Sequence, residues 1–309
     1  MTCIASIDIG TNTVRLVIFQ TELTGGLIQL YQAMAITRLG EGMDTKKRLL
    51  DARMDETISK LIEFRKKCRE FEPLIIRAVA TSAVRESSNQ QEFVSRAKRE
   101  ADIEIEVIPW EQEAGLMIKG VLWKLPNTEK DILAFDIGGG STEFILARDR
   151  KIISAFGTLL GSIRLTEKFI SRHPIDISEY KLLEVFLRRE LREVKNKLSD
   201  FPPELLLGTA GTVTTLAAID ENIYPYDSEK VHGKSITFKR VEEILETLKR
   251  KSLDERLAMR TIEKGREDLI IAGGALTLEI MRIFNCKLLT ISDYGLREGL
   301  VLDALNQEC

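Results

Sequence analysis

Histidine is nearly absent from this chain of 309 residues. The two that occur, His173 and His232, are too few for a metal site built on imidazole ligands. Four cysteines occur without CxxC spacing, which favours structural thiols in a reduced cytoplasm over disulfides or zinc. They are Cys3, Cys68, Cys286 and Cys309.

Long apolar runs and a basic excess are also missing. No apolar run approaches the roughly 20 residues that span a bilayer, and no signal peptide is recognisable, so we expect neither a membrane protein nor an exported one. The net charge of -3 argues against a general nucleic-acid binder, because such proteins usually carry a basic surplus. A polyanionic small molecule is compatible with this charge if positive side chains gather at one place.

The length and the apolar content are enough for two domains, and one sequence motif occurs twice. The length of 309 residues predicts two domains, and the apolar fraction of 44% is ample for two cores. IDIGTNTVRLVI begins at residue 7, and FDIGGGSTEFIL follows at an offset of 128 residues, so that Asp8 aligns with Asp136 and Arg15 with Glu143. Each copy links two β-rich runs through a short glycine- or hydroxyl-rich segment, which predicts a tight hairpin.

Hydrophobic periodicity predicts the same order of elements in both halves. The expected strands cover 3–9, 14–20, 27–32, 74–80 and 103–108, then 132–137, 143–147, 151–155, 204–208 and 287–291. The expected helices cover 52–70, 89–101 and 111–122, then 161–172, 178–198, 239–250 and 267–284, with others from about 212 and 296. We therefore expect two α/β domains, 1–125 and 126–309, joined near Leu125-Pro126-Asn127-Thr128, with helix 297–309 free to pack back on the first. The paired hairpins would point into a cleft between the domains.

The glycine loop of the second copy is suited to an anion and a metal. Three consecutive glycines let several backbone N–H groups face one point, and Ser141 adds a hydroxyl donor. Asp136 and Glu143 flank the loop with carboxylate oxygens, the ligands that Mg2+ takes in proteins. A plain hairpin needs one or two glycines but no flanking carboxylates, so we interpret the loop as a phosphate and Mg2+ site. It is not a Walker loop, because GxxxxGK[ST] is missing.

Three further groups of residues offer donors for phosphate. The first hairpin carries Thr11, Asn12 and Arg15, although Arg15 is also compatible with a strand surface. The segment ATSAVR ends a buried strand at the edge where open α/β sheets bind ligands. Its Arg85 either binds an anion, caps a helix or pairs with the next residue, Glu86. The loop GTAGT at 208–212 precedes a helix, a natural phosphate site that ordinary turn chemistry also explains.

Seven blocks of this sequence resemble the exopolyphosphatase/guanosine pentaphosphate phosphatase family in order and spacing, over nearly the whole chain. They are DIGTNTVRL, ATSAVRESSN, EQEAG, DIGGGSTE, GTAGTVTTLA, VHGK and SDYGLREG. The resemblance implies two ribonuclease-H-like domains of the actin-like ATPase superfamily, Mg2+, and release of terminal phosphate from polyphosphate or pppGpp. Because the chain stops soon after SDYGLREG, it resembles the short form, without an additional C-terminal helical domain.

The resemblance also places the family's catalytic glutamate at Glu113 in EQEAG. From the residues alone Glu113 is more simply a surface helix residue, and Glu111 a residue that stabilises a helix N-terminus. A carboxylate that opens a helix can orient and deprotonate a water. The candidate phosphate ligands are Thr11, Asn12, Arg15, Arg85, Gly138, Gly139, Gly140, Ser141, Gly208, Gly211, Thr212, Lys234 and Arg266, and the candidate metal ligands are Asp8, Asp136 and Glu143.

Two other functions compete with a phosphohydrolase. A sugar or acetate kinase of the same superfamily would need ATP and an acceptor, and the blocks with Arg85 and Glu113 speak against it. A ppGpp or polyphosphate sensor with decayed catalysis is opposed by the retained Glu113, Asp136 and Glu143. The expected partners are polyphosphate or a guanosine polyphosphate of the stringent response, with no nucleic acid and no membrane. The sequence leaves a homodimer open and does not decide between the two substrates.

Overall fold

The chain forms two compact units. The computed structural model describes residues 2–22, 26–71, 74–125, 130–149, 151–198 and 203–307. One unit comprises residues 1–123 with 295–309, and the other comprises residues 124–294. The turn Pro126-Asn127-Thr128, where we expect the domain boundary, lies outside the described residues, as does Cys309.

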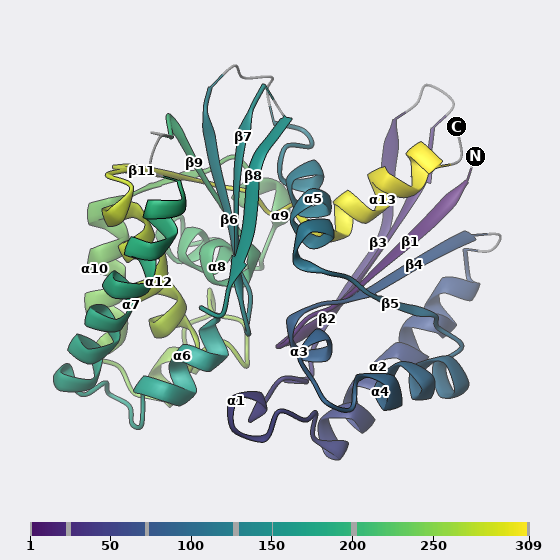
Figure 1. The fold of residues 1–309 in the computed structure, drawn as a ribbon, viewed down its shortest axis with the longest axis horizontal. Helices are drawn as coiled ribbons and strands as arrows, with labels where there is room; N and C mark the ends of the chain where they lie inside the picture. Colours follow the sequence, from purple (N-terminus) through teal and green to yellow (C-terminus); the bar gives the residue numbers. More distant parts are fainter. Residues whose placement is uncertain are drawn as a thin grey trace. The chain divides into compact units, whose positions relative to one another are not determined.

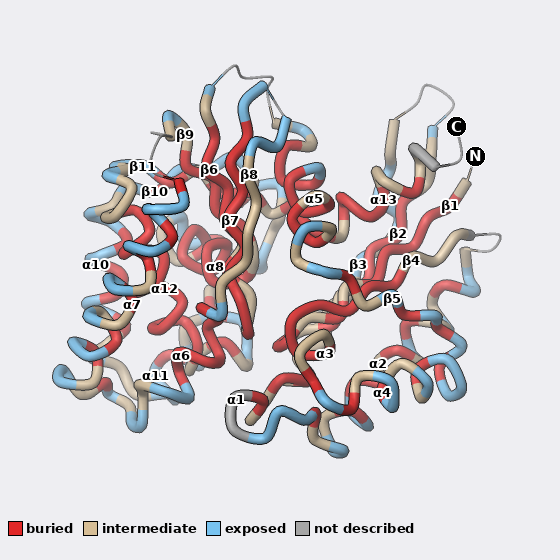
Figure 2. The backbone as a smooth tube through the Cα atoms, in the orientation of Figure 1, coloured by how far each residue is buried: buried red, intermediate tan, exposed pale blue. Residues whose placement is uncertain are grey.

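The first unit is built on a five-stranded sheet in the order β3-β2-β1-β4-β5 (Figure 1). Its strands are β1 (Cys3–Ile9), β2 (Thr13–Thr21), β3 (Leu27–Ile36), β4 (Leu74–Ala80) and β5 (Ile105–Val107). The first three pair antiparallel, whereas β4 pairs in parallel with β1 and with β5. The central strand β1 is buried along nearly its whole length, as its apolar sequence predicts (Figure 2).

Helices cover both faces of this sheet because side chains alternate along β1. Ile7 and Ile9 pack in a core with helices α2 (Asp51–Arg69) and α4 (Gln90–Arg96), whereas Ile4 packs on α13 (Leu296–Gln307). Helix α5 (Trp110–Val121) packs beside α13. The contact is close, since a Cβ added to Gly120 would stand 1.8 Å from the carbonyl oxygen of Gly295. Short helices α1 (Met43–Lys46) and α3 (Ser82–Arg85) and a π-helical turn at Ala97–Ala101 complete the unit.

The second unit repeats this sheet and extends it by one strand. Its strands are β6 (Ile132–Ile137), β7 (Thr142–Arg148), β8 (Lys151–Thr158), β9 (Leu205–Thr209), β10 (Ser235–Thr237) and β11 (Leu288–Ile291). Their order is β10-β11-β9-β6-β7-β8, so that β8-β7-β6-β9-β11 corresponds to the five strands of the first unit. The register corresponds as well, because Asp8 faces Arg15 and Asp136 faces Glu143. The expectation of two ribonuclease-H-like α/β units is confirmed.

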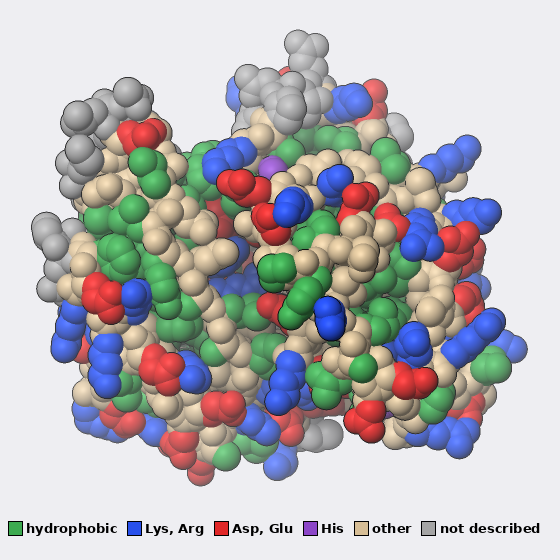
Figure 3. Space-filling view, turned by 180° about the vertical axis from the view of Figure 1, so that it is seen from behind, with side chains coloured by type: hydrophobic (Ala, Val, Ile, Leu, Met, Phe, Trp, Pro, Cys, Tyr) green, Lys and Arg blue, Asp and Glu red, His purple; other side chains and the backbone are tan. Residues whose placement is uncertain are grey.

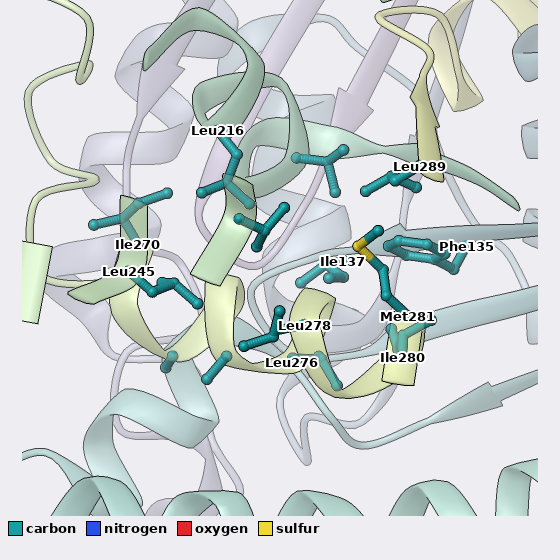
Figure 4. Close-up of a cluster of buried hydrophobic side chains, with 14 of the residues drawn as sticks. Phe135, Ile137, Leu216, Leu245, Ile270, Leu276, Leu278, Ile280, Met281 and Leu289 are labelled. Carbon is teal, nitrogen blue, oxygen red and sulfur yellow. The ribbon is translucent and has the colours of Figure 1, made fainter. Parts of the chain in front are cut away.

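The core of the second unit lies where helices meet the sheet. Its helices are α6 (Ser162–Phe169), α7 (Ile177–Lys197), α8 (Ala210–Asp220), α9 (Ser228–Val231), α10 (Phe238–Lys249), α11 (Leu253–Leu257) and α12 (Ile270–Ile283). Figure 4 shows side chains of α12, among them Met281, close to Phe135 of β6 and Leu289 of β11. Helix α12 is buried along almost all of its length, which explains why its sequence is apolar on every side.

Most predicted elements are confirmed, with a few differences at their ends. The strands 3–9, 74–80 and 132–137 have the predicted bounds, whereas the helix expected at 89–101 is α-helical only over Gln90–Arg96 before it widens into the π-helical turn. The helix expected from about residue 212 begins at Ala210. Helices α9 and α11 and strand β10 were not predicted, because they are too short to establish a period.

The described surface carries both signs of charge. On the face drawn in Figure 3, Lys and Arg side chains are interspersed with Asp and Glu. Ion pairs of the described residues include Arg240 with Asp220 and Lys119 with Asp303. Among the described residues, no helix combines the length and the apolar character needed to span a bilayer.

Candidate active site

The hairpin loop of the first unit is held by its own turn and by the chain after β3. The N–H of Gly10 donates to the carbonyl of Thr13 at 2.9 Å, which closes the turn. The carbonyl of Asn12 accepts from the N–H groups of Thr37 and Arg38, both at 3.0 Å. The carbonyl of Thr11 accepts from Gly40 at 2.9 Å, and a Cβ on Gly40 would collide with the side chain of Thr11. These contacts hold the loop in one conformation.

The Asn12 side chain is an unexplained polar group in this loop. It is only 7% exposed, and both its amide nitrogen and its amide oxygen are buried without a hydrogen-bond partner among the described residues. Buried amides of folded proteins are nearly always paired, so each exception calls for a ligand, an ion or a water. The placement of Asn12 thus agrees with a ligand-binding role.

Asp8 and Arg15 face each other across β1 and β2. Burial raises the pKa of Asp8, while the guanidinium groups of Arg15 and Arg297 oppose that rise and Glu298 adds to it. Arg297 and Glu298 open α13, and the buried Glu298 accepts from the N–H of Gly295 at 2.8 Å. Sequence reasoning noted their block, SDYGLREG, but assigned these two residues no role.

Arg85 and Glu113 form an ion pair in the first unit. Nη1 of Arg85 donates to Oε2 of Glu113 at 2.6 Å and to the carbonyl of Ile108 at 2.9 Å. Glu113 is 7% exposed, so the simpler interpretation as a surface helix residue is wrong. Glu86 accepts from the hydroxyl of Ser82 at 2.8 Å, and Arg85 forms its ion pair with Glu113.

The Arg85 guanidinium also stacks on an aromatic ring, and two of its nitrogens make no hydrogen bond to the described residues. Its carbon lies 4.1 Å from the ring centroid of Trp110, the first residue of α5. Nε and Nη2 are buried and have no hydrogen-bond partner among the described residues. A guanidinium has five N–H donors, and the two nitrogens left over can take an anion such as a phosphate oxygen.

The glycine loop of the second unit has the same turn as the first, with more support. The N–H of Gly138 donates to the carbonyl of Ser141 at 3.0 Å, as that of Gly10 does to Thr13. The carbonyls of Gly138 and Gly139 accept from the N–H groups of Ser162 and Ile163, both at 2.9 Å. Because the start of α6 takes up these carbonyls, the loop is fixed from behind.

Arg164 supports the third glycine of the loop. Its Nε donates to the carbonyl of Gly140 at 2.6 Å, and burial lowers the pKa of its guanidinium. The backbones of α6 and the loop approach so closely that a Cβ on Gly161 would lie 2.2 Å from the carbonyl oxygen of Gly139. Sequence reasoning missed Arg164, because in the sequence it looks like an ordinary basic residue of an amphipathic helix.

The carboxylates of the second unit come from the two strands of the hairpin. Asp136 and Glu143 are cross-strand neighbours, and both Glu143 and Ser141 are 3% exposed. Neighbouring residues on one face of a sheet have Cβ atoms about 4.5–5.5 Å apart, so the two side chains share one region. Within the described ranges, no cluster of three or more His, Cys, Asp or Glu side chains could hold a metal. A metal here would have two protein carboxylates.

The third loop joins β9 to α8 and contacts Arg266. A Cβ on Gly211 would stand 1.8 Å from Nη1 of Arg266, so the guanidinium rests directly on the glycine. Nε of Arg266 donates to Glu263 at 2.8 Å. Ala210 has a φ of 69°, a left-handed conformation that costs a non-glycine residue about 1–2 kcal/mol. Such strain is often retained at functional sites.

The other two candidates in this unit are Thr212 and Lys234. Thr212 is buried and packs on Gly273, where a Cβ would meet its hydroxyl at 2.4 Å. Lys234 is exposed and pairs with Glu221 at 3.1 Å. Glu221 follows α8, whose 11 residues place it about 16 Å from the Gly211 end. The structure thus brings Arg266 to the third loop. The carbonyl of Lys234 accepts from the N–H of Ile291 at 2.8 Å, and Ile291 is the strand neighbour of Gly208, so the backbone of Lys234 lies on the side of the sheet where this loop begins, while its amino group contacts Glu221.

Two α/β units of the same sheet order, each with a rigid loop between its first two strands, define a protein of the actin-like, ribonuclease-H-like class. Residues 17–308 match the model of the Ppx/GppA phosphatase family, and the chain belongs to that family.

Relatives and solved structures agree with this assignment. The chain is 32% identical to a bifunctional 3-dehydroquinate synthase/phosphatase of Fusobacterium nucleatum over 98% of its own length, but it spans only 47% of that relative. It is 28% identical to exopolyphosphatase 2 of Mycobacterium tuberculosis, over 98% of each chain. The crystal structure of the Aquifex aeolicus Ppx/GppA family member is 37% identical and superposes with a TM-score of 0.84, over 99% of this chain and 98% of the other.

Proposed function

We propose that this phosphatase is an exopolyphosphatase, which hydrolyses the terminal phosphoanhydride bond of inorganic polyphosphate. The observation that carries the proposal is the buried Arg85–Glu113 pair, in which Arg85 keeps two nitrogens without a partner among the described residues. A carboxylate next to donors suited to an anion is what a phosphohydrolase needs to hold a water beside a phosphate. Relatives named exopolyphosphatase support polyphosphate as the substrate.

In this proposal Glu113 acts on the attacking water. The carboxylate accepts a proton from the water as the oxygen bonds to the terminal phosphorus. The phosphoanhydride bond on the opposite side breaks, the bridging oxygen leaves with the shortened chain, and orthophosphate is released. Such chemistry rests on positioning and charge rather than on a covalent intermediate. Nε and Nη2 of Arg85 bind the phosphate chain while Nη1 stays on Glu113.

The loops and other cations bind the phosphate oxygens. We assign Thr11, Asn12 and Arg15 of the first unit to this role. From the second unit we assign Gly138, Gly139, Gly140, Ser141, Gly208, Gly211, Thr212 and Arg266, with Lys234 for more distant phosphates.

Magnesium is the metal that we propose for the reaction. Mg2+ binds through one or two carboxylates plus phosphate oxygens and waters, and the Asp136–Glu143 pair fits that donor set. Asp8 is a third candidate, although the nearby arginines make it less suited to a cation. When bound, the metal would neutralise charge on the phosphate. The protein's part is to hold the two carboxylates next to a rigid glycine loop.

A second substrate, pppGpp, follows from the same chemistry, because its terminal phosphate is also held by a phosphoanhydride bond. The test is to compare phosphate release from long-chain polyphosphate and from pppGpp at one Mg2+ concentration, with and without ATP and small acceptors. We expect release from polyphosphate that needs neither ATP nor acceptor. Transfer of phosphate from ATP to an acceptor would identify a kinase instead. Tight binding without turnover would identify a sensor.

A further inference from the structure

Trp110, Arg85 and Glu113 form a cluster that the proposed chemistry uses only in part. The guanidinium contacts three different groups: the carbonyl of Ile108, the carboxylate of Glu113 and the ring of Trp110. Trp110 and Glu113 are three residues apart in α5, and helical residues at this spacing share one face. One turn of α5 therefore contributes both the proposed base and the ring that covers its cationic partner.

We propose that Trp110 is a positioning residue, which fixes Arg85 so that one guanidinium serves Glu113 and the phosphate chain together. This inference rests on the proposed function. An aromatic ring attracts a guanidinium through its face, whereas all the N–H donors of the guanidinium point outward in its plane. Stacking therefore fixes the plane of Arg85 without occupying a donor. Nη1 remains on Glu113, and Nε and Nη2 remain for phosphate oxygens.

The ring of Trp110 adds a restraint that the hydrogen bonds of Arg85 do not supply. Among the described residues, Nη1 is the guanidinium nitrogen that makes hydrogen bonds, so without the ring the guanidinium could rotate about those contacts. Rotation would move Nε and Nη2 and loosen Glu113 at the same time. Because a displacement of about 1 Å at a reacting group can cost about 100-fold in rate, holding the plane has a kinetic effect.

The first test replaces the ring and measures turnover of polyphosphate. Trp110→Leu removes the stacking and should lower kcat/KM by about 5- to 30-fold, whereas Trp110→Phe keeps an aromatic face and should stay within about threefold. In an Arg85→Ala background, Trp110→Leu should have almost no additional effect, because the partner is gone. Phe186→Leu is the matched control: its ring has Lys168 at 4.1 Å, in the second unit, and its loss should leave turnover unchanged.

The second test needs no turnover. The chain has two tryptophans, so Trp123→Phe leaves Trp110 as the only indole reporter. Trp123 packs on Phe19 in an apolar cluster away from Arg85, and phenylalanine preserves an aromatic ring there. Emission of Trp110 should change on addition of inorganic tripolyphosphate and saturate. Arg85→Ala should shift the ligand-free emission and abolish the response to tripolyphosphate.

The outcomes separate this inference from the proposed function. If Trp110→Leu and Arg85→Ala have additive effects on kcat/KM, or if Trp110→Leu turns over like the wild type, Trp110 is not a positioning residue. If the wild type releases no phosphate from any substrate, the proposed function fails. The titration with tripolyphosphate then still decides whether Trp110 and Arg85 respond to a phosphate chain together, and an unchanged emission refutes their coupling.

Discussion

In the first unit Arg15 lies opposite Asp8, whereas at the equivalent position of the second unit Glu143 lies opposite Asp136. The turns, the strand pairing and the order of the sheet are otherwise the same. An aspartate that faces an arginine is already neutralised, and the pair can offer its remaining donors to an anion. Two carboxylates side by side repel each other and favour a cation between them. In our proposal, this one exchange of residue makes the first hairpin an anion site and the second a cation site.

The two loops also differ in the groups that support them. The first loop is held by backbone groups of Thr37, Arg38 and Gly40, and its Asn12 amide lacks a partner among the described residues. The second loop is held by α6 and by the buried guanidinium of Arg164. The positive charge of Arg164 behind the glycine loop attracts phosphate. This attraction offsets the repulsion between phosphate and the carboxylates of Asp136 and Glu143. We therefore propose that the metal and the phosphate share this loop.

The largest effect that we expect concerns the proposed base, Glu113 of the first unit. Glu113→Gln should lower kcat by about 10²–10⁴-fold and leave tripolyphosphate binding nearly intact, because the amide keeps the shape but cannot accept the proton. Single-turnover phosphate release measures the loss. Glu111→Gln is the control, since Glu111 is an exposed neighbour in the same helical turn. Wild-type turnover of Glu113→Gln would remove this residue from the mechanism.

The difference between Arg15 and Glu143 can be tested by measuring how much Mg2+ each variant needs for activity. Glu143→Gln should raise the Mg2+ concentration for half-maximal activity by about 10- to 100-fold, because it removes a carboxylate that binds the metal or its water. Arg15→Gln should leave that concentration unchanged and raise the KM for polyphosphate about tenfold, the usual effect of losing one charged hydrogen bond. The comparison fails if both variants shift the same parameter.

The amino-acid sequence predicts the two hairpin loops but not the groups that support them. The hairpins, the glycines and the facing carboxylates are local patterns, so strands such as β6 and the Asp136–Glu143 pair could be predicted. The partner of Glu113 lies 28 residues away in the sequence, and that of Arg164 lies 24 residues away. No period connects such residues, because their meeting depends on how α3, α5 and α6 pack. Their burial is a tertiary property that a single sequence does not show.

The third loop offers a variant with a smaller effect. Gly211→Ala places a methyl group where the guanidinium of Arg266 now lies, and a flexible side chain can move away. We expect the KM for polyphosphate to rise by about 2- to 5-fold, because the displaced guanidinium would weaken its proposed hydrogen bond to phosphate, with little change in Tm.

Gly208→Ala is the matched change in the same loop. Its methyl group would meet Phe135, Val213 and Leu289 at 2.9–3.1 Å, so it should destabilise the fold by about 1–3 kcal/mol. The interpretation of Arg266 is contradicted if Gly211→Ala lowers Tm as Gly208→Ala does and leaves KM unchanged.

Helix α5, which carries Glu113, is positioned by a glycine contact with α13. Gly120→Ala would bring a methyl group to 1.8 Å from the carbonyl oxygen of Gly295, a backbone atom that cannot yield easily, so we expect a loss of about 1–3 kcal/mol. Gly115 lies in the same helix with nothing within 4 Å of an added Cβ. Gly115→Ala should therefore gain about 0.5–1 kcal/mol from helix propensity. Urea unfolding measures both, and a gain for Gly120→Ala would refute the packing argument.

The smallest effect that we expect is a pH dependence of stability that arises in the second unit, because both histidines belong to it. Burial and the guanidinium of Arg256, which contacts Nδ1 of His173, lower the pKa of His173 below 6.5, while Asp268 and Glu179 act in the opposite direction. Between the folded pKa and 6.5 the unfolded chain binds more protons than the folded one, so stability rises with pH in that window and is lost as pH falls through it. His173→Gln should remove this contribution to the change of the free energy of unfolding with pH. The measurement is the urea midpoint of both proteins between about pH 5 and pH 8, the range in which histidine titrates. Equal slopes for the two proteins would show that His173 does not titrate on unfolding, and that the acid sensitivity of the second unit has another origin.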